Sequence, residues 1–342
     1  MIIMTKITPD TYKSAMELVT LGKYSSLEHF TEVAIRNQLV LESENDNQQS
    51  QNHVLDNAMS TSHNESFVGF QPRTVDPIPL SKERRGKPIW GLINRFAPGK
   101  LVLRMLANGL ESSTTEWINY KEFAAGVVER AISMRNQIEK HYKNSQIVRG
   151  EGLQIGFPQK DENSRQRFID IYIGRLRSDS RIDGFLGDLE LGVIRKASDG
   201  SLQIGITEAG LKLANLKSPL LDEFFTVEHP IAFFKNEIHF LMNHVKKTRP
   251  GEYQFLDYLF TSVKNGMDTP QEIGNQVADY VKKNKWTNSR GESISEAELN
   301  TMKVGGMARL VEMRLIRIEK DGIHTKYQAS SELDSLEGLL NE

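Results

Sequence analysis

Cysteine is absent from the 342 residues of this chain. Its absence excludes disulfide bonds, thiol nucleophiles and cysteine-ligated zinc sites. No stretch approaches the roughly 18 consecutive apolar residues of a membrane-spanning helix, so we expect no membrane span. The first residues lack the basic segment and apolar core of a secretory signal, and we therefore expect a cytoplasmic protein.

An excess of positive charge is also lacking. The chain has 43 Lys and Arg residues against 45 Asp and Glu residues, for a formal net charge of −2. Such a balance provides no global attraction to nucleic acid. Any contact with phosphates therefore has to come from local basic surface, with acidic residues segregated elsewhere.

Motifs of the common enzyme classes are missing as well. The sequence contains no phosphate-binding Gly-x-x-x-x-Gly-Lys loop, no Gly-x-Gly-x-x-Gly after a strand and no His-Glu-x-x-His. Asp188 and Glu190 lie near Arg195 and Lys196, as in some metal-dependent nucleases, but the pattern puts them on a helix and a hairpin rather than at converging strand ends. We predict a non-enzymatic protein with no cofactor and no metal site.

The chain is organised around residues 191–210. A short apolar strand runs into Asp199-Gly200, alternating residues follow, and a helix opens at Thr207-Glu208. Asp-Gly predicts a two-residue hairpin, because both central positions of that turn need positive φ. The pattern recurs at 311–327 around Asp321-Gly322. A mainly α chain with short β-hairpins is predicted, and a helix followed by such a hairpin resembles the winged-helix (winged helix-turn-helix) family.

Residues 1–42 form a separate small unit. Thr8-Pro9-Asp10 predicts a helix start, and Ser25 with Glu28 has the spacing of a capping box for a second helix. The residues Glu17-Leu18-Val19, Gly22-Lys23-Tyr24-Ser25-Ser26-Leu27, Phe30 and Ala34-Ile35-Arg36 closely resemble the ribbon-helix-helix family. The resemblance covers about the first 42 residues of the chain.

In that family, two chains pair their N-terminal strands into one ribbon that lies in the DNA major groove. The resemblance therefore implies a homodimer formed through this segment, with a phosphate held at Ser25 and Ser26. Physical arguments agree, because one short strand and two short helices cannot bury a core alone, and free N–H groups converge at a helix start. The outward ribbon face, Ile2, Met4 and Lys6, departs from the family in having one polar base reader, Lys6.

The remaining chain is predicted to fall into further segments. Residues 43–80 are a flexible linker, because their first part has no apolar periodicity. Residues 81–150 form a helical, degenerate winged-helix domain that contains a helix at 120–143. A winged-helix domain follows at 151–218, with a helix at 163–177 and a recognition helix at 181–190. A connecting helix lies within 219–249, a winged-helix domain with helices at 253–264, 270–283 and 295–313 spans 250–330, and 331–342 form an acidic tail.

Double-stranded DNA is the predicted partner. Seven basic residues against one acid between 82 and 104 favour phosphate contact, and the third helix of the last domain is placed as the major-groove reader. The predicted DNA-binding residues are Lys6, Ser25, Ser26, Lys82, Arg84, Arg85, Lys87, Arg95, Lys100, Arg104, Arg165, Arg181, Arg195, Lys196, Lys303, Arg309 and Arg317.

Transcriptional regulation is the role most typical of such an organisation. Alternatives are a plasmid partition adaptor with an ATPase or effector protein as partner, and a DNA-recognition subunit of an anti-phage or restriction system. A third is a winged-helix protein-interaction subunit of a chromosome-organising complex, which the near-neutral charge favours.

Overall fold

The computed structural model describes residues 69–89, 91–145, 153, 155–223, 231–288, 291–321, 324–330 and 335–341, with Lys13, Met16, Thr20, Ser26 and Leu27. The chain divides into two compact units, Met1–His63 and Asn64–Glu342. In the first unit, Lys13, Met16 and Thr20 are helical, and the Thr20 hydroxyl donates to Met16 O at 2.8 Å. The expected ribbon strand, with Lys6, and Ser25 lie outside the described residues.

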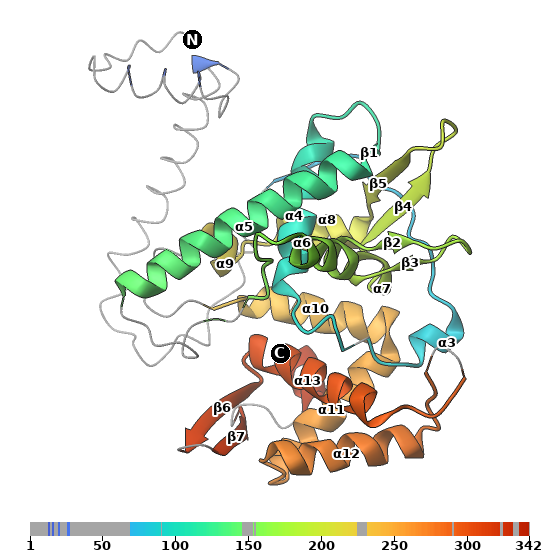
Figure 1. The fold of residues 1–342 in the computed structure, drawn as a ribbon, viewed down its shortest axis with the longest axis vertical. Helices are drawn as coiled ribbons and strands as arrows, with labels where there is room; N and C mark the ends of the chain where they lie inside the picture. Colours follow the sequence, from blue (N-terminus) through green and yellow to red (C-terminus); the bar gives the residue numbers. More distant parts are fainter. Residues whose placement is uncertain are drawn as a thin grey trace. The chain divides into compact units, whose positions relative to one another are not determined.

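The second unit is mainly helical with short antiparallel hairpins, as the sequence predicts (Figure 1). We call residues 69–223 the first lobe and residues 231–341 the second lobe. The first lobe contains α3 (Lys82–Arg85), α4 (Ala97–Glu111), β1 (Ile118–Asn119), α5 (Tyr120–Asn144), α6 (Glu162–Phe168), the π-helical turn η1 (Ile169–Ile173), β2 (Arg175–Leu176), β3 (Ile182–Asp183), α7 (Phe185–Asp188), β4 (Gly192–Lys196), β5 (Leu202–Ile206), α8 (Glu208–Asn215) and α9 (Pro219–Asp222).

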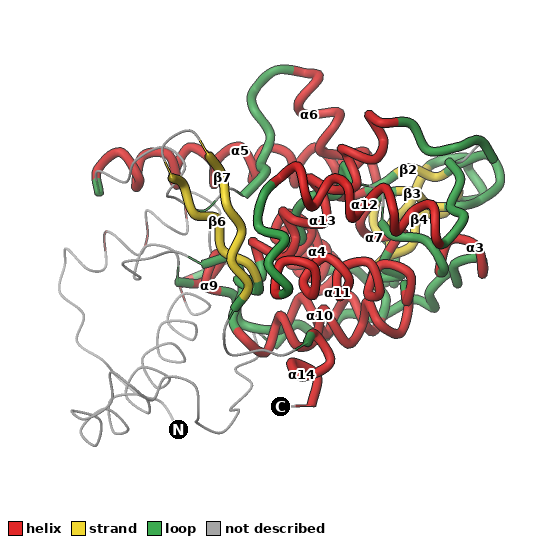
Figure 2. Tube along the Cα trace, turned by 90° about the horizontal axis from the view of Figure 1, so that it is seen from below, coloured by secondary structure: helices red, strands yellow, loops and turns green. Residues whose placement is uncertain are grey.

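The second lobe contains α10 (Lys235–Thr248), α11 (Pro250–Lys264), α12 (Pro270–Lys283), α13 (Glu296–Glu312), β6 (Ile316–Asp321), β7 (His324–Ala329) and α14 (Leu336–Asn341). Capping boxes start α12 at Thr269 with Glu272 and α13 at Ser295 with Glu298. Seen from below, α10, α11 and α13 lie close together, and the β6–β7 hairpin lies to one side of them (Figure 2).

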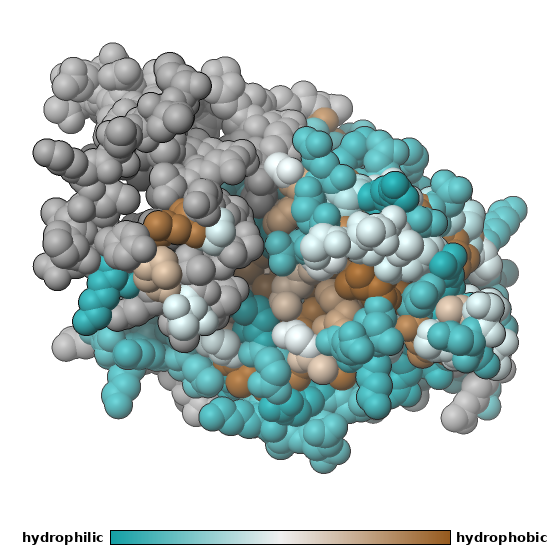
Figure 3. Space-filling view, turned by 90° about the horizontal axis from the view of Figure 1, so that it is seen from above, coloured by the Kyte–Doolittle hydropathy of each residue, from teal (hydrophilic) through white to brown (hydrophobic). Residues whose placement is uncertain are grey.

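Each lobe is built on a largely buried helix. On α4, Leu103, Leu106 and Ala107 are fully buried, and on α11 so are Phe255 and Leu259. The described apolar side chains of both lobes join in one contiguous core. Outside it the surface is mostly hydrophilic, with hydrophobic side chains gathered toward the middle of the face seen from above (Figure 3).

The sheet of the first lobe crosses the boundary that we expected between residues 150 and 151. Strand β5 lies between β1 and β4, with Ile118 opposite Ile204 and Ile194 opposite the same residue on the other side. Because β1 belongs to the expected third segment and β5 to the fourth, the two segments share one sheet and one core.

The recognition helix expected at 181–190 is wrong. Strand β3 and the four-residue α7 occupy this stretch. Gly184 has φ +101°, and a Cβ there would lie 2.7 Å from Gly174 Cα, so the chain turns sharply against another turn. The helix expected at 163–177 ends early for a related reason, because Gly174 has φ +105° and closes η1.

Both predicted hairpins are present, but their turns differ from the prediction. In the first, Ala197 N donates to Ser201 O at 2.8 Å, and Gly200 N donates to Ala197 O at 3.0 Å. Gly200 has φ +86°, whereas Asp199 does not have positive φ; its carboxylate accepts from Ser201 N at 2.9 Å. The loop therefore has three residues and one left-handed position. In the second hairpin, Asp321 pairs with His324 and ends a strand.

The expectations for residues 69–80 and for the acidic tail also need correction. Residues 69–80, expected in a flexible linker, lie along the first lobe: Val75 N donates to Ile206 O at 2.9 Å, and Phe70 N donates to the Asn215 side chain at 2.9 Å. Part of the expected acidic tail forms α14, in which Leu336 and Leu339 are buried. Apolar side chains in these stretches provide the contact area that stabilises them.

The two lobes meet where Gly91 crosses α13. A Cβ on Gly91 would lie 2.2 Å from Thr301 O, and one on Gly305 would lie 2.6 Å from Gly91 O. The absence of side chains at both positions lets the two backbones come into direct contact. The close approach of Gly91 to α13 is therefore possible only with glycine at both positions.

We predict that Gly91→Ala lowers the free energy of unfolding by about 2 kcal/mol, because the new methyl group overpacks a backbone contact. Gly126→Ala is the matched control, since Gly126 is exposed on α5 with no atom near its Cβ position. That control should raise stability by about 0.5–1 kcal/mol through helix propensity. Denaturant titration of both variants checks the signs, and an unchanged Gly91→Ala variant would refute the close contact.

Candidate functional site

Most of the basic residues between 82 and 104 are used inside the protein. Lys100 is fully buried; its Nζ lies 3.1 Å from the Glu237 carboxylate and donates to Leu213 O and Leu216 O. Arg104 binds the Asp222 carboxylate with both terminal nitrogens, at 2.8 and 3.1 Å, and also donates to carbonyls at the end of α8. The prediction that Lys100 and Arg104 contact DNA is therefore wrong.

The other members of this cluster are only partly available. Arg84 donates to Asp188 at 2.8 Å, and Lys87 donates to Glu83 at 2.7 Å and to Thr287 O. Arg85 is exposed, although it donates to Lys247 O, and Arg95 is half-buried beside Asn94 O. Lys82 is exposed. The fold thus reduces the local excess of cations seen in the sequence, because acids and carbonyls bind most of them, while Lys82 and Arg85 stay exposed.

Helix α13 does not present the basic face that we expected. Arg309 is fully buried, and its guanidinium donates to Glu252 at 2.8 Å and to Ile93 O. Lys303 is half-buried against α12, where it reaches Pro270 O. A major-groove role for Arg309 is therefore wrong, and the exposed residues of α13 contain no cation: Glu296, Ala297, Asn300 and Val304.

The last residue of α13 joins the lobes. The Glu312 carboxylate is buried and accepts from Phe96 N at 2.6 Å and Ala97 N at 3.2 Å, so it caps the start of α4, where no local side chain does so. Burial raises the pKa of Glu312 to about 7, while Arg95 and the two N–H groups oppose that shift.

The β4–β5 hairpin and α6 keep exposed cations. Arg195 stacks over Trp117 at 3.8 Å from the ring centroid, and Lys196 is exposed beside the hairpin loop. On α6, Arg165 is held by Glu129, whereas Arg167 is exposed, as are Asn163 and Gln166. Arg167 was not among the predicted DNA-binding residues. The sequence could have identified it, because Arg167 lies outside the apolar positions of that helix.

An open cleft of about 990 Å³ lies between the lobes. Its walls are residues 78–93 around α3, residues 170–192 around the β2–β3 hairpin, and residues 286–302 of the second lobe. Arg181, predicted on a recognition helix, instead lies beside β3 in this wall, with its Nε 3.2 Å from Asp183.

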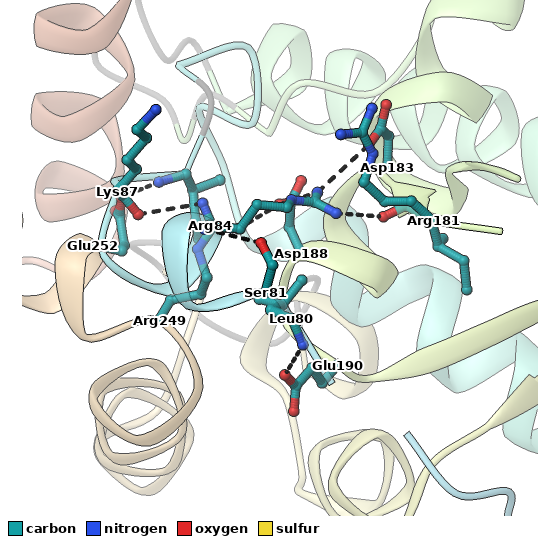
Figure 4. A network of polar contacts seen from close by, with 12 residues as sticks. Leu80, Ser81, Arg84, Lys87, Arg181, Asp183, Asp188, Glu190, Arg249 and Glu252 are labelled. Atoms are coloured by element: carbon teal, nitrogen blue, oxygen red, sulfur yellow. Dashed lines mark hydrogen bonds and ion pairs between the residues drawn. The ribbon is translucent and has the colours of Figure 1, made fainter. Parts of the chain in front are cut away.

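An ion-pair network forms the floor of the cleft. Arg84 lies in the middle, with Asp188 and Arg249 to one side and Asp183 to the other (Figure 4). Arg249 donates to Asp188 at 2.6 Å and to Pro88 O at 2.9 Å. Burial lowers the pKa of the Arg249 guanidinium and Asp188 opposes the shift, but an arginine stays charged in either case.

Sequence spacing could not reveal this network, because Arg84 and Asp188 are 104 residues apart. Asp188 and Glu190, considered above as nuclease carboxylates, are engaged elsewhere: Asp188 in these ion pairs, and Glu190 as acceptor for Leu80 N at 2.9 Å. Within the described ranges, no group of three His, Asp or Glu side chains is placed to hold a metal ion. No described helix has the length and apolar character needed to cross a membrane.

The remaining predicted DNA-binding residues are not among those that line the cleft. Arg317 is exposed on β6, and Ser26 is half-buried in the N-terminal unit. Comparison with protein-family models, curated proteins and solved structures finds no match to this chain. Within the second unit, the structure brings together one set of predicted residues, Arg84, Lys87 and Arg181, and it does so at the cleft.

We predict that Lys100→Met lowers the free energy of unfolding by about 3–5 kcal/mol at pH 8, because it leaves the Glu237 carboxylate buried without a cation. In the folded protein the pKa of Glu237 is already raised by burial to about 7, and that of Lys100 is lowered to about 8. A raised carboxyl pKa favours the folded state below the unfolded pKa, and this contribution is lost as the pH rises through the folded value. The loss in Lys100→Met should therefore be smaller at pH 5.

Two further variants test the explanation. Glu237→Gln added to Lys100→Met should restore at least about 1 kcal/mol at pH 8, since the uncompensated charge is removed. Lys82→Met, on an exposed side chain of α3, should change stability by less than about 0.5 kcal/mol at either pH. Equal effects of Lys82→Met and Lys100→Met would show that Lys100 is not buried in an ion pair.

Proposed function

We propose that this chain is a non-enzymatic, dimeric DNA-binding protein whose body contacts DNA through α6 and the β4–β5 hairpin of the first lobe. The N-terminal segment supplies the dimer and a second DNA contact, as its resemblance to ribbon-helix-helix proteins implies. The second lobe has a supporting role. Transcriptional regulation remains the role that this organisation favours, with partition and defence as alternatives that share the same DNA contacts.

The order of elements in each lobe supports this proposal. The first lobe runs α4, β1, α5 and α6–η1, continues through the short β2–β3 hairpin and the four-residue α7, and closes with β4 and β5, where β5 lies between β1 and β4. The second runs α11, α12, α13, β6 and β7, and Tyr327 N on β7 donates to Asp268 O, between α11 and α12, at 2.7 Å. Three helices closed by a hairpin that pairs with the first connection is the order of a winged helix. In that architecture the third helix enters the major groove and the wing lies alongside.

The observation that carries the proposal is the contrast between the two third helices. The exposed face of α6 offers Asn163, Gln166 and Arg167, which are side chains that bind base edges and phosphates. Helix α13 is in the corresponding place in its lobe, but residues 88–97 pack on it, and its cation Arg309 is buried. This contrast supports the first lobe, rather than the second, as the one that contacts DNA.

The wing of the first lobe adds phosphate contacts. Arg195 is held extended by its stacking on Trp117 and by donation to Gln203 at 3.0 Å, so little side-chain entropy remains to be lost on binding. Lys196 follows it at the end of β4. Two cations on a wing beside a polar helix provide a local basic surface on a chain of net charge −2.

A second candidate, protein interaction by the second lobe, is favoured by one observation. Val304 on α13 and Ile318 on β6 are both 49% exposed, although they are large apolar side chains. Half-buried Ala308 and Val311 extend the apolar surface along α13. This surface suits a protein partner better than DNA, as in the chromosome-organising alternative.

We predict that Arg167→Glu with Lys196→Glu weakens binding of the full chain to a duplex of about 30 base pairs by at least about tenfold at moderate salt. Loss of two phosphate contacts should also reduce the slope of log K against log salt by about 2. Fluorescence anisotropy at several salt concentrations measures both quantities.

The matched control carries the same change of charge on the second lobe, Arg314→Glu with Arg317→Glu, both at exposed positions. Its affinity should stay within about twofold of the unchanged chain, apart from a weak long-range effect that salt screens. A larger loss in the control than in the first variant would contradict the assignment of DNA contact to the first lobe.

A further inference from the structure

The interlobe cleft contains cations whose hydrogen-bonding capacity the protein leaves unused. Arg177 and Arg181 lie at the two ends of the β2–β3 loop, and each binds the Asp183 carboxylate through Nε, at 2.5 and 3.2 Å. No described residue accepts a hydrogen bond from their terminal nitrogens, and both side chains are 47% exposed. Two guanidinium groups are thus oriented by one carboxylate while their donor ends stay open.

The carboxylates of the cleft are, by contrast, all engaged. Asp170 pairs with Arg175, Asp183 and Asp188 pair with the arginines named above, and Glu83 pairs with Lys87. The others accept from backbone or hydroxyl groups: Asp179 from Arg181 N, Glu190 from Leu80 N, and Glu298 from Ser295. The groups left to meet a ligand at this wall are therefore donors with positive charge.

The charge around Asp183 also favours an anionic ligand. Arg84, Arg177 and Arg181 all lie within 3.5 Å of this single carboxylate. Arg84 pairs more closely with Asp188, but Arg177 and Arg181 share Asp183, so the charge of these two arginines is only partly neutralised, although the cleft as a whole is nearly balanced. An anionic group could accept hydrogen bonds from the terminal nitrogens of Arg177 and Arg181 and balance their remaining positive charge.

Apolar side chains also line the cleft. Ile78 and Leu92 are 44% and 40% exposed, unusual for such side chains, and Trp286 and Ile294 are half-buried. A ligand that fits has an anionic head for the arginines and an apolar or planar body for this surface. The volume of about 990 Å³ accommodates a small molecule of this kind.

We propose that the interlobe cleft binds an organic phosphate, a phosphate ester with an apolar or planar body, and that Arg177 and Arg181 hold its phosphate group. A tetrahedral phosphate presents oxygens in several directions and carries more negative charge than a carboxylate, so it can accept hydrogen bonds from the terminal nitrogens of both arginines at once. The site goes beyond DNA contact at α6 and does not depend on it. Because both lobes line the cleft, the ligand stabilises their arrangement.

Isothermal titration of the full chain at constant ionic strength tests the site with four probes: AMP, hexyl phosphate, inorganic phosphate and adenosine. At least one of the two esters should bind about tenfold more tightly than both inorganic phosphate and adenosine, because it alone fills both parts of the cleft. Tighter binding of AMP identifies a planar body, and tighter binding of hexyl phosphate an aliphatic one. Absence of saturable ester binding with Kd below about 1 mM overturns the proposal.

Variants locate the binding. Arg177→Gln with Arg181→Gln should weaken ester binding at least about tenfold, whereas the control Arg130→Gln with Arg317→Gln, at exposed positions outside the cleft, should change it by less than about twofold. Leu92→Gln is a second test that breaks no ion pair and adds no charge, and it should weaken the esters while leaving inorganic phosphate unaffected. Unchanged ester binding in the arginine variant, or equal losses in variant and control, would overturn the assignment.

Discussion

The buried junction between α13 and the start of α4 is the constraint on which the body depends. Arg309, with no exposed surface, binds Glu252 and a carbonyl of the crossing segment, and Glu312 one turn later accepts the first free N–H groups of α4. Burying these charges is costly, and hydrogen bonds made by both Glu312 oxygens and by Nε and Nη1 of Arg309 offset part of the cost, while Nη2 of Arg309 has no hydrogen-bond partner among the described residues. This junction fixes how the two lobes are oriented and covers part of α13. The cleft lies between the lobes beside this junction.

The same principle applies to several other basic residues. Lys100 with Glu237, Arg104 with Asp222, and Arg249 with Asp188 each link a residue of one element to a distant one. Cations held in this way do not contribute to a basic surface, although many other Lys and Arg side chains of the described residues are exposed. This distribution explains why DNA contact is proposed for a limited area of the first lobe, and why the open arginines of the cleft stand out.

The two lobes share an order of elements but differ in how they use it. In the first, α6 and the β4–β5 hairpin are exposed and polar, which is the basis of the proposed DNA contact. In the second, α13 is part of the interlobe packing, and its outward face is apolar at Val304. This difference between the lobes depends on Gly91, because the close contact between its backbone and α13 leaves no room for a side chain. One lobe thus provides the proposed DNA contacts while the other provides a wall of the cleft.

The sequence by itself determined the local structure. The bounds expected for the helices at 270–283 and 295–313 agree nearly to the residue with α12 and α13, and Asp-Gly predicted both hairpins, because such signals act over a few positions of the chain. Tertiary structure decided which cations are available. Arg309 has the sequence context of a groove reader, but its partner Ile93 O is 216 residues away, and Arg84 meets Asp188 across 104 residues. Charge pairing and burial between such distant residues leave no periodic signal, so the cleft became visible only in the folded chain.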